Sequence, residues 1–243
     1  MRFSNKVAMI TGAGQGLGAA FAKAFANEGA AVALVGRSLH KLEKAASEIS
    51  MSGGRAVCCK TDVSDYLQVN KCVEKVINTL GKIDILVNNA AVFRSAPVTE
   101  MSPEDWDLQI KANLYGTFYC SKAVLPYMMG KRYGKIVNIS SSAVKMYFPG
   151  FGAYSASKAG IVGFAQVLSE EVKQYGINVN SIYLGMTNTE VVRERMNNKD
   201  SAITVSADEM LQVEEVAEIV AFLASDGAKA IMGAAIDVFG KKS

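Results

Sequence analysis

The stretch Thr11-Gly12-Ala13-Gly14-Gln15-Gly16-Leu17-Gly18 lies between a short apolar run at residues 6–10 and a helical pattern at residues 19–27. Glycines at such a place allow a tight turn and a close approach of the backbone to a ligand. The first amides of the following helix can donate hydrogen bonds to a pyrophosphate. The spacing G-x-x-x-G-x-G therefore predicts a dinucleotide-binding turn. The alternative is a turn of small residues that only packs a helix on a sheet.

Short apolar runs alternate with helical patterns along the rest of the chain. Apolar runs of this length are typical of strands that are covered on both faces. Strict alternation of strand and helix implies parallel pairing through right-handed crossovers. The sequence therefore predicts an α/β fold with a doubly wound, Rossmann-type parallel sheet. The expected strands are 6–10, 31–35, 56–59, 83–87, 135–139, 178–182 and 235–238, and the expected helices are 19–27, 39–49, 66–80, 103–129 (with a break near Asn113), 154–172 and 213–224.

The composition is that of a globular chain. Of the 243 residues, 50% are hydrophobic and 20% are charged, and the formal net charge is +3. No basic block points to nucleic acid, no apolar run reaches membrane-spanning length, and the first residues lack a signal-peptide core. The four cysteines lack metal-ligand spacing and are too few for a disulfide scaffold. We therefore expect one domain, residues 1–243, in the cytoplasm, with no nucleic-acid, membrane or metal partner.

A second informative stretch is Tyr154-Ser155-Ala156-Ser157-Lys158, within one of the expected helices. Residues four apart lie on one helix face, so the phenol of Tyr154 and the ammonium of Lys158 can point into the same space. A free phenol has a pKa of about 10, and a neighbouring cation lowers it towards useful proton transfer. An ordinary surface tyrosine and lysine are the alternative, because a two-residue pattern is short.

The glycine turn and the Tyr154/Lys158 pair together resemble the classical short-chain dehydrogenase/reductase family, over almost the whole chain. Asn88-Asn89-Ala90-Ala91 stands where the family usually has Asn-Asn-Ala-Gly. Asn113 lies in a long expected helix, and Ser141 lies 13 residues before Tyr154, a spacing that matches the family. These motifs follow one another in the family's order. Among its members, the chain resembles those that act as 3-oxoacyl-(acyl-carrier-protein) reductases.

The resemblance implies a catalytic set of four residues. Tyr154 would give a proton to a carbonyl during reduction, or take one from an alcohol during oxidation. Lys158 would lower the pKa of Tyr154 and hold the nicotinamide ribose, and Ser141 would hydrogen-bond the substrate oxygen. Asn113 would support a water relay that ends at Lys158. Taken singly, Asn113 could instead be a polar residue that interrupts a helix, and Ser141 a loop cap.

The choice between NAD(H) and NADP(H) depends on the residues after the second expected strand. A carboxylate there hydrogen-bonds the ribose 2′-hydroxyl of NAD, whereas arginine suits the 2′-phosphate of NADP. This chain has Gly36, followed by Arg37 and Ser38. We therefore expect NADP(H) to be preferred over NAD(H), with a merely solvated Arg37 as the alternative. Gln15 argues against the preference, because NADP-preferring relatives often have a basic residue in the glycine turn.

The resemblance implies further contacts with the cofactor. Asp62 and Val63 follow the third expected strand at the positions of an adenine-contacting pair, although Asp62 could also cap a helix. Thr189 resembles a threonine that contacts the nicotinamide carboxamide. The full set of expected cofactor residues is Gly12, Gln15, Gly16, Leu17, Gly18, Arg37, Asp62, Val63, Asn89, Ala90, Tyr154, Lys158 and Thr189.

Three positions depart from the usual family pattern. Ala91 stands for a glycine and Leu184 for a proline, and Val238-Phe239-Gly240 stands where Val-Asp-Gly-Gly is common. These changes leave the catalytic set intact. They bear instead on the nicotinamide end of the cofactor and on a C-terminal contact between subunits.

Substrate choice is expected to depend on residues 92–94, residues 144–151 and a polar, irregular stretch at 186–207 that is predicted to form a lid. Phe148 and Phe151, with Met146 and Tyr147, predict an apolar or aromatic-tolerant pocket. Arg94 either meets an anionic group or lies on the rim.

We therefore expect an oxidoreductase that transfers a hydride between NADP(H) and a carbonyl or secondary alcohol substrate, with 3-oxoacyl thioesters and small or cyclic ketones as candidates. The resemblance also implies a homo-oligomer, either a tetramer or a dimer, through the helix at 103–129, the Tyr154 helix and the C-terminus. The alternative is a catalytically silent NADP(H)-binding regulatory or scaffold protein.

Overall fold

The structure is a computed structural model that describes residues 1–196 and 209–240. Its centre is a seven-stranded sheet in the order β3-β2-β1-β4-β5-β6-β7, and neighbouring strands pair in parallel. The predicted Rossmann-type doubly wound sheet is thereby confirmed. The strands are β1 (Val7–Thr11), β2 (Ala31–Gly36), β3 (Arg55–Lys60), β4 (Ile85–Asn88), β5 (Gly134–Ile139), β6 (Ile177–Leu184) and β7 (Ala235–Val238).

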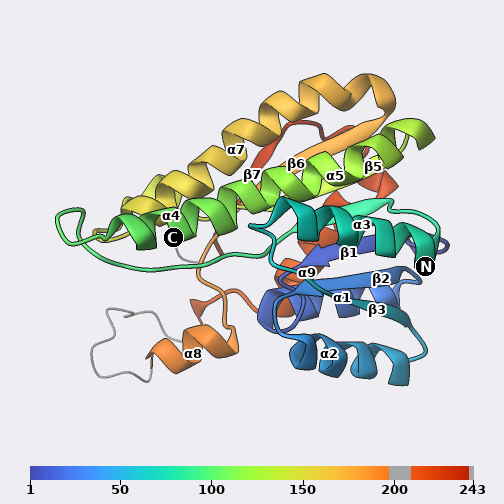
Figure 1. Cartoon of the computed structure of the whole chain (residues 1–243), viewed down its shortest axis with the longest axis horizontal. Coiled ribbons are helices and arrows are strands. Elements are labelled where there is room, and N and C mark those ends of the chain that lie inside the picture. The colour runs from blue at the N-terminus through green and yellow to red at the C-terminus, as the bar shows by residue number, and fades with distance from the viewer. Residues whose placement is uncertain (197–208, 241–243) are drawn as a thin grey trace.

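Two layers of helices cover the sheet (Figure 1). Helices α1 (Gly16–Asn27), α2 (Leu39–Met51) and α9 (Val213–Leu223) lie on one face, and α3 (Tyr66–Leu80), α5 (Gly116–Lys131) and α7 (Gly152–Val172) lie on the other. Adjacent strand residues point to opposite faces. Leu34 of β2 therefore belongs to the core with Phe21 of α1, whereas its neighbour Val35 belongs to the core with Val73 of α3.

The order of the strands places a switch point between β1 and β4. From β1 the chain proceeds outwards to β2 and β3, and it then returns to β4 on the other side of β1. In open parallel sheets, ligands bind outside the carboxyl ends of the strands at such a point. The segments that follow β1 and β4 are the glycine turn and the Asn88–Asn89 stretch, so the fold brings these two motifs together.

The helix that follows β3 begins at Tyr66, which is too late in the chain for Asp62 to be its N-cap. Asp65 is the N-cap of α3, because its carboxylate accepts hydrogen bonds from the backbone N–H groups of Leu67 and Gln68. Asp62 instead accepts hydrogen bonds from the backbone and hydroxyl of Ser64. The suggestion that Asp62 caps the helix is therefore wrong. Asp62 and Asp65 are both suitable N-cap residues, and the sequence alone did not show which of them precedes the first turn of the helix.

The predicted break in the long helix is a π-helical turn. Helix α4 (Pro103–Gln109) begins as predicted, with the Ser102 hydroxyl accepting from the backbone of Asp105. The chain then continues through a π turn, Ile110–Tyr115, into α5. Such a turn inserts an extra residue and is frequent at functional sites. Asn113 lies in this turn and is fully buried.

Two short helices are absent from the sequence prediction. Helix α6 (Ala143–Met146) follows β5, and α8 (Glu190–Met196) lies in the stretch that was expected to be irregular. With one or two turns each, they are too short for a hydrophobic period to emerge from the sequence. Residues 197–207 of the predicted lid lie outside the described residues.

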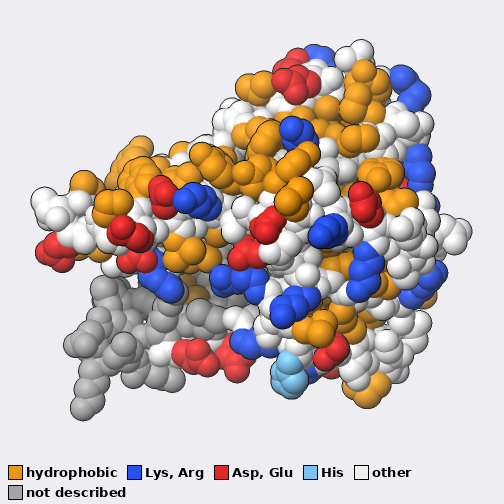
Figure 2. All heavy atoms as spheres, in the orientation of Figure 1, with side chains coloured by type: hydrophobic (Ala, Val, Ile, Leu, Met, Phe, Trp, Pro, Cys, Tyr) orange, Lys and Arg blue, Asp and Glu red, His pale blue; other side chains and the backbone are white. Residues whose placement is uncertain are grey.

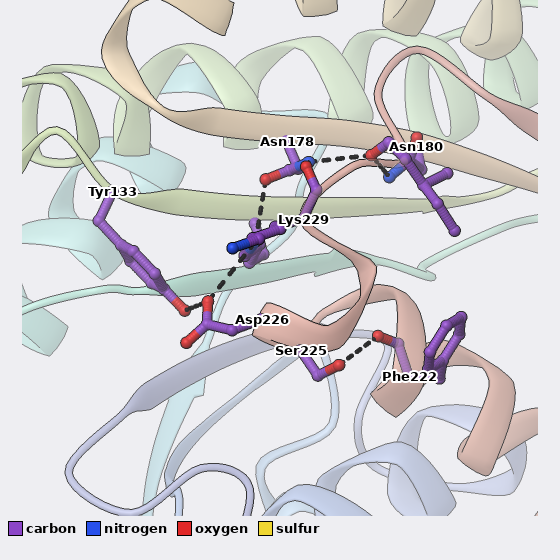
Figure 3. A network of polar contacts seen from close by, with 9 residues as sticks. Tyr133, Asn178, Asn180, Phe222, Ser225, Asp226 and Lys229 are labelled. Carbon is purple, nitrogen blue, oxygen red and sulfur yellow. Dashed lines mark hydrogen bonds and ion pairs between the residues drawn. The ribbon is translucent and has the colours of Figure 1, made fainter.

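A polar network that runs from the interior to the surface lies at the amino ends of β5 and β6 (Figure 3). Lys135 Nζ donates to Asn178 Oδ1 at 2.9 Å and lies 3.6 Å from the carboxylate of Asp226, which also accepts from the Tyr133 hydroxyl. Burial lowers the pKa of the Lys135 ammonium. Asn178 in turn donates to the carbonyl of Lys229. The network therefore fixes the segment between α9 and β7 against the sheet.

The face that carries α4, α5 and α7 exposes many apolar side chains, which are orange in Figure 2. Trp106, Tyr115 and Phe118 on the α4–α5 segment and Val167 on α7 are among the exposed large hydrophobic residues. Contiguous apolar surface of this kind is typical of interaction sites. No helix of the described residues is both long enough and apolar enough to cross a membrane. The single histidine, His40, is exposed on α2.

Candidate active site

The glycine turn between β1 and α1 is shaped by close backbone contacts. A Cβ atom on Gly18 would lie 2.2 Å from the Gly12 carbonyl oxygen, so no larger residue fits there. Gly12 and Gly16 have φ angles of 68° and 54°, which favour glycine. A Cβ on Gly16 would meet nothing nearer than Thr189, at 3.8 Å. Gly12 and Gly18 therefore close the turn, while Gly16 leaves space between the start of α1 and Thr189.

The stretch after β4 is hydrogen-bonded to this turn. The Asn89 side chain donates to the Thr11 carbonyl at 2.9 Å, and the backbone N–H groups of Asn89 and Ala90 donate to the Thr11 hydroxyl. These contacts place Asn89 and Ala90, two of the predicted cofactor residues, beside Gly12. The departure at Ala91 is accommodated, because its φ is not positive.

The Lys158 side chain is buried between α7 and the end of β5. Its ammonium donates to the Ile139 carbonyl at 2.7 Å and lies 5.6 Å from the centre of the Tyr154 ring. Burial lowers the pKa of Lys158 to about 8. The Ser140 hydroxyl donates to the Lys158 carbonyl, which attaches this turn of α7 to the sheet. The structure therefore places the ammonium next to Tyr154, as the four-residue spacing predicted.

Asn113 connects the π turn to the start of α7. Its amide nitrogen donates to the Ser157 hydroxyl at 3.0 Å, and that hydroxyl donates to the Tyr154 carbonyl at 2.7 Å. The same side chain pairs with both backbone groups of Val92, accepting at 2.7 Å and donating at 3.0 Å. Asn113 therefore joins three segments that meet at Tyr154.

Ser141 lies at the carboxyl end of β5, where it is half-buried. Its hydroxyl accepts from the backbone N–H of Ala143, so it makes the local contact of a loop cap. The Ser155 hydroxyl donates to the Ala143 carbonyl at 3.0 Å and attaches this turn to α7. Ser141 thus follows the strand that holds Lys158, on a turn that is bonded to the Tyr154 helix.

Of the remaining predicted cofactor residues, Arg37 and Val63 follow β2 and β3, and Thr189 follows β6. Val63 is buried and packs against Gly116 of α5, where a Cβ would lie 2.7 Å from its side chain. Arg37 is exposed and makes no hydrogen bond or ion pair with the described residues. Thr189 accepts from the backbone of Val192 in α8 in addition to lying above Gly16.

Comparisons with known proteins place this geometry in a family. A family profile described as short chain dehydrogenase matches residues 6–200. The chain belongs to the short-chain dehydrogenase family. It is therefore an NAD(P)-dependent oxidoreductase that acts on alcohol and carbonyl groups.

Three similar proteins show the range of this family. The 3-oxoacyl-(acyl-carrier-protein) reductase FabG of Thermotoga maritima is 37% identical over 243 residues, covering 99% of this chain and 98% of that protein. Subunit BbsD of a hydroxy(phenyl)methylsuccinyl-CoA dehydrogenase of Thauera aromatica is 35% identical, covering 100% and 98%. A structure of NAD⁺-bound xylitol dehydrogenase superposes with a TM-score of 0.90 at 28% identity, covering 99% and 100%.

One basic residue near the glycine turn was missed by the sequence reasoning. Lys41 lies in the first turn of α2, and its ammonium donates to the side chain of Gln15. A Cβ on Gly14 would lie 3.0 Å from the Lys41 Cβ, so α2 packs directly on the turn. The sequence offered only the position of Lys41, four residues after Arg37, as a signal.

Two departures from the family pattern lie side by side in the short-chain dehydrogenase fold. Leu184 ends β6, and the following Gly185 donates to the Val238 carbonyl at 2.8 Å. A Cβ on Gly185 would lie 2.9 Å from the backbone of Phe239. The changes at Leu184 and Phe239 therefore affect a single contact between the ends of β6 and β7.

The described part of the predicted lid borders the glycine turn. Thr187 forms a bridge with Leu211, and the Arg193 guanidinium donates to Asn188 Oδ1 at 2.9 Å. A hollow of about 400 Å³ lies between Gly16 and these segments. The hollow has the position expected of a ligand site at the carboxyl edge of the sheet.

Asn113→Ala should lower the free energy of unfolding by about 2–3 kcal/mol, because both backbone groups of Val92 would lose their buried partner. For a chain of this size, the melting temperature should fall by about 4–12 °C. Thermal unfolding followed by circular dichroism measures the change. Asn70→Ala is the control, since that amide only donates to the Tyr66 carbonyl on the exposed side of α3. Equal losses in the two variants would contradict the assigned role.

Proposed function

We propose that this short-chain dehydrogenase reduces a ketone with NADPH, or oxidises the corresponding secondary alcohol with NADP⁺, and that Tyr154, Lys158, Ser141 and Asn113 carry the reaction. The observation on which this depends is the buried Lys158 ammonium beside the Tyr154 ring. A buried lysine with an altered pKa next to a tyrosine is typical of a site that moves protons.

The residues around the glycine turn fit a dinucleotide. Gly18 and Gly12 leave the backbone bare where a pyrophosphate approaches, and α1 begins at Gly16 without an acidic residue in its first turn. Thr189 stands across the space from Gly16. When bound there, the nicotinamide supplies the hydride that reaches the substrate carbon.

Tyr154 supplies the proton in this proposal. In reduction, its hydroxyl protonates the carbonyl oxygen, and in oxidation the phenolate accepts the proton of the alcohol. The Lys158 ammonium favours the phenolate electrostatically, and this effect is strong because burial removes competing water. The Ser141 hydroxyl donates to the same substrate oxygen and stabilises its developing charge.

Asn113 has a positioning role in the proposal. Through Ser157 it holds the carbonyl of Tyr154, and through Val92 it holds the segment that follows β4. The family resemblance also implies that Asn113 supports a water relay that ends at Lys158. A change of Asn113 would therefore disturb the alignment of Tyr154 without removing a reacting group.

The preference for NADP(H) is supported by two cations at the start of α2. Arg37 is exposed and available for a 2′-phosphate, and Lys41 reaches Gln15 in the glycine turn. The missing basic residue of the turn is thus supplied from the neighbouring helix. Both cations carry a charge that suits a phosphate, and no carboxylate follows β2 to repel one.

The proposed substrate is a small ketone or 3-oxoacyl thioester, in line with the reductase from Thermotoga maritima. BbsD of Thauera aromatica is named for an alcohol that carries a phenyl group.

We also propose that residues 1–243 form one catalytic domain, since a single sheet contains all the strands from β1 to β7. The four cysteines are free, which supports a reducing cytoplasm.

Tyr154→Phe should abolish turnover, with a loss of kcat of about 10²-fold or more, because the proton donor is removed while the ring remains. Binding of NADPH, followed by fluorescence titration, should persist within about twofold. Absorbance of NADPH with a panel of ketones measures turnover. Normal turnover by Tyr154→Phe would contradict the proposal. Inactivity of the unaltered protein on every carbonyl and alcohol would favour a catalytically silent cofactor-binding protein.

Arg37→Asp should reduce the ratio of kcat/KM for NADPH to that for NADH by about tenfold or more, through charge reversal beside the 2′-phosphate. Lys41→Met should reduce the same ratio by about fivefold, as expected for loss of an exposed ion pair. Lys44→Met is the matched control, an exposed lysine on the same helix. An unchanged ratio in Arg37→Asp would show that the cofactor preference has another origin.

The exposed apolar face of α4, α5 and α7 supports a homo-oligomer formed through these helices. Light scattering should give twice or four times the chain mass of 25.9 kDa. Phe118→Asp should shift the protein towards the monomer, because it places a charge in the apolar contact. Met51→Asp, at the end of α2 on the other face, should leave the assembly unchanged. A monomeric unaltered protein would contradict the proposal.

A further inference from the structure

A continuous series of aromatic rings ends at Tyr154. The rings of Phe148 and Phe151 are 5.3 Å apart, those of Phe151 and Phe93 are 4.6 Å apart, and those of Phe93 and Tyr154 are 5.1 Å apart. The Phe93 and Tyr154 rings meet edge to face, at an angle of 85°. Phe151 also meets the Tyr154 ring edge to face, at 6.3 Å. Two phenylalanines therefore flank the proposed proton donor.

The backbone on either side of Phe93 is fixed. Val92 is bonded to the buried Asn113 side chain, and the Arg94 N–H donates to the side chain of Gln109, which is also fully buried. The Ala96 N–H donates to the Gly150 carbonyl at 3.1 Å, which joins this segment to the one that carries Phe148 and Phe151. The ring of Phe93 is therefore held in place before any substrate arrives.

The outer part of this aromatic series is open to solvent. Phe148 is 41% exposed, and its neighbour Tyr147 is 83% exposed. Tyr147 also adopts a φ of 51°, which is rare for a bulky residue. Such a conformation is populated on the order of tenfold less than an ordinary one in an unconstrained chain. Exposed aromatic side chains and an unusual backbone angle therefore occur together at the outer end of the series, which reaches Tyr154 through Phe151.

The position of Phe93 restricts which substituents the carbonyl carbon of a substrate can carry. A carbonyl oxygen that reaches the Tyr154 hydroxyl brings the substituents of its carbon within range of the flanking rings. A planar aromatic substituent can pair with such rings at 4.5–7 Å between centres, offset or edge to face. This pairing contributes about two- to tenfold in affinity beyond the burial of apolar area. A saturated ring of the same size gains only from burial.

We propose that Phe93 and Phe151 bind the aromatic ring of an aryl ketone whose carbonyl oxygen is bonded to Tyr154. This inference rests on the proposed function of Tyr154 and names the substrate class for that site. The ketone carbon receives a hydride from NADPH, the oxygen receives the Tyr154 proton, and the product is a secondary alcohol with the aryl group on its carbinol carbon. Phe93 determines specificity, and Tyr154 performs the proton transfer.

Acetophenone and cyclohexyl methyl ketone provide a matched test, because they share a carbon skeleton and differ in the unsaturation of the ring. With NADPH and the full chain, kcat/KM should be about three- to tenfold higher for acetophenone. Phe93→Leu and, separately, Phe151→Leu should each remove most of this selectivity by lowering the value for acetophenone alone. Phe222→Leu is the control, an exposed phenylalanine on α9 on the opposite face of the sheet. Thermal unfolding verifies that each variant is folded.

Saturation-transfer NMR with the NADPH-loaded protein measures binding of the two ketones independently of turnover. Selective binding of acetophenone that is lost in Phe93→Leu supports the inference even if no ketone is reduced. In that case only the proposed function is contradicted. Equal binding of the two ketones by the unaltered protein overturns the inference, whatever the turnover. An equal loss for both ketones in Phe93→Leu also overturns it, because it assigns the ring a purely structural role.

Discussion

The buried ammonium of Lys158 is the constraint on which the rest of the site depends. Burial alone lowers the pKa of this group from 10.5 to about 8, which corresponds to a cost of roughly 3 kcal/mol in the charged state. One carbonyl, that of Ile139 at the end of β5, accepts from the ammonium at 2.7 Å. The end of β5 and the first turns of α7 must therefore stay in register, and the Ser140 contact to the Lys158 backbone fixes them. The same arrangement places the ammonium where the proposed proton transfer requires it.

The π turn at Asn113 extends this constraint to the neighbouring segments. An α-helical continuation from α4 into α5 would change the direction of the Asn113 side chain. In the π turn, the side chain reaches both Ser157 on α7 and the backbone of Val92 after β4. One residue thus positions the Tyr154 helix and the segment that begins the aromatic series. The alignment of Tyr154 with the aromatic rings therefore depends on one structural feature, the π turn.

Much of the fold could be predicted because it depends on local patterns. The alternation of apolar runs and helices, the glycine turn and the Ser102 cap each follow from neighbouring residues, and the structure confirms them. What the sequence missed depends on contacts between distant segments. The contact of Lys41 with Gln15 needs α2 to pack on the glycine turn, and the choice of Asp65 over Asp62 as a cap depends on where α3 begins. The network at Lys135 likewise depends on the pairing of β7 with β6, and no local sequence pattern predicts this network.

The catalytic roles stay predictions for all four site residues, Asn113, Ser141, Tyr154 and Lys158. The structure nevertheless brings Asn113, Tyr154 and Lys158 together around β5 and α7.

The aromatic series and the buried ammonium both lie beside the Tyr154 ring. Phe93 and Phe151 meet this ring edge to face and place apolar carbon atoms next to it. A lower local dielectric constant strengthens the attraction between the Lys158 charge and the phenolate. A low dielectric constant also disfavours each charge on its own, and burial lowers the pKa of Lys158 to about 8. In the proposed reaction, the attraction acts only while Lys158 is protonated, which holds below about pH 8. In the proposed reaction, a substrate ring that packs on Phe93 would exclude water from the site of proton transfer, so that substrate binding would strengthen the attraction between the Lys158 charge and the phenolate.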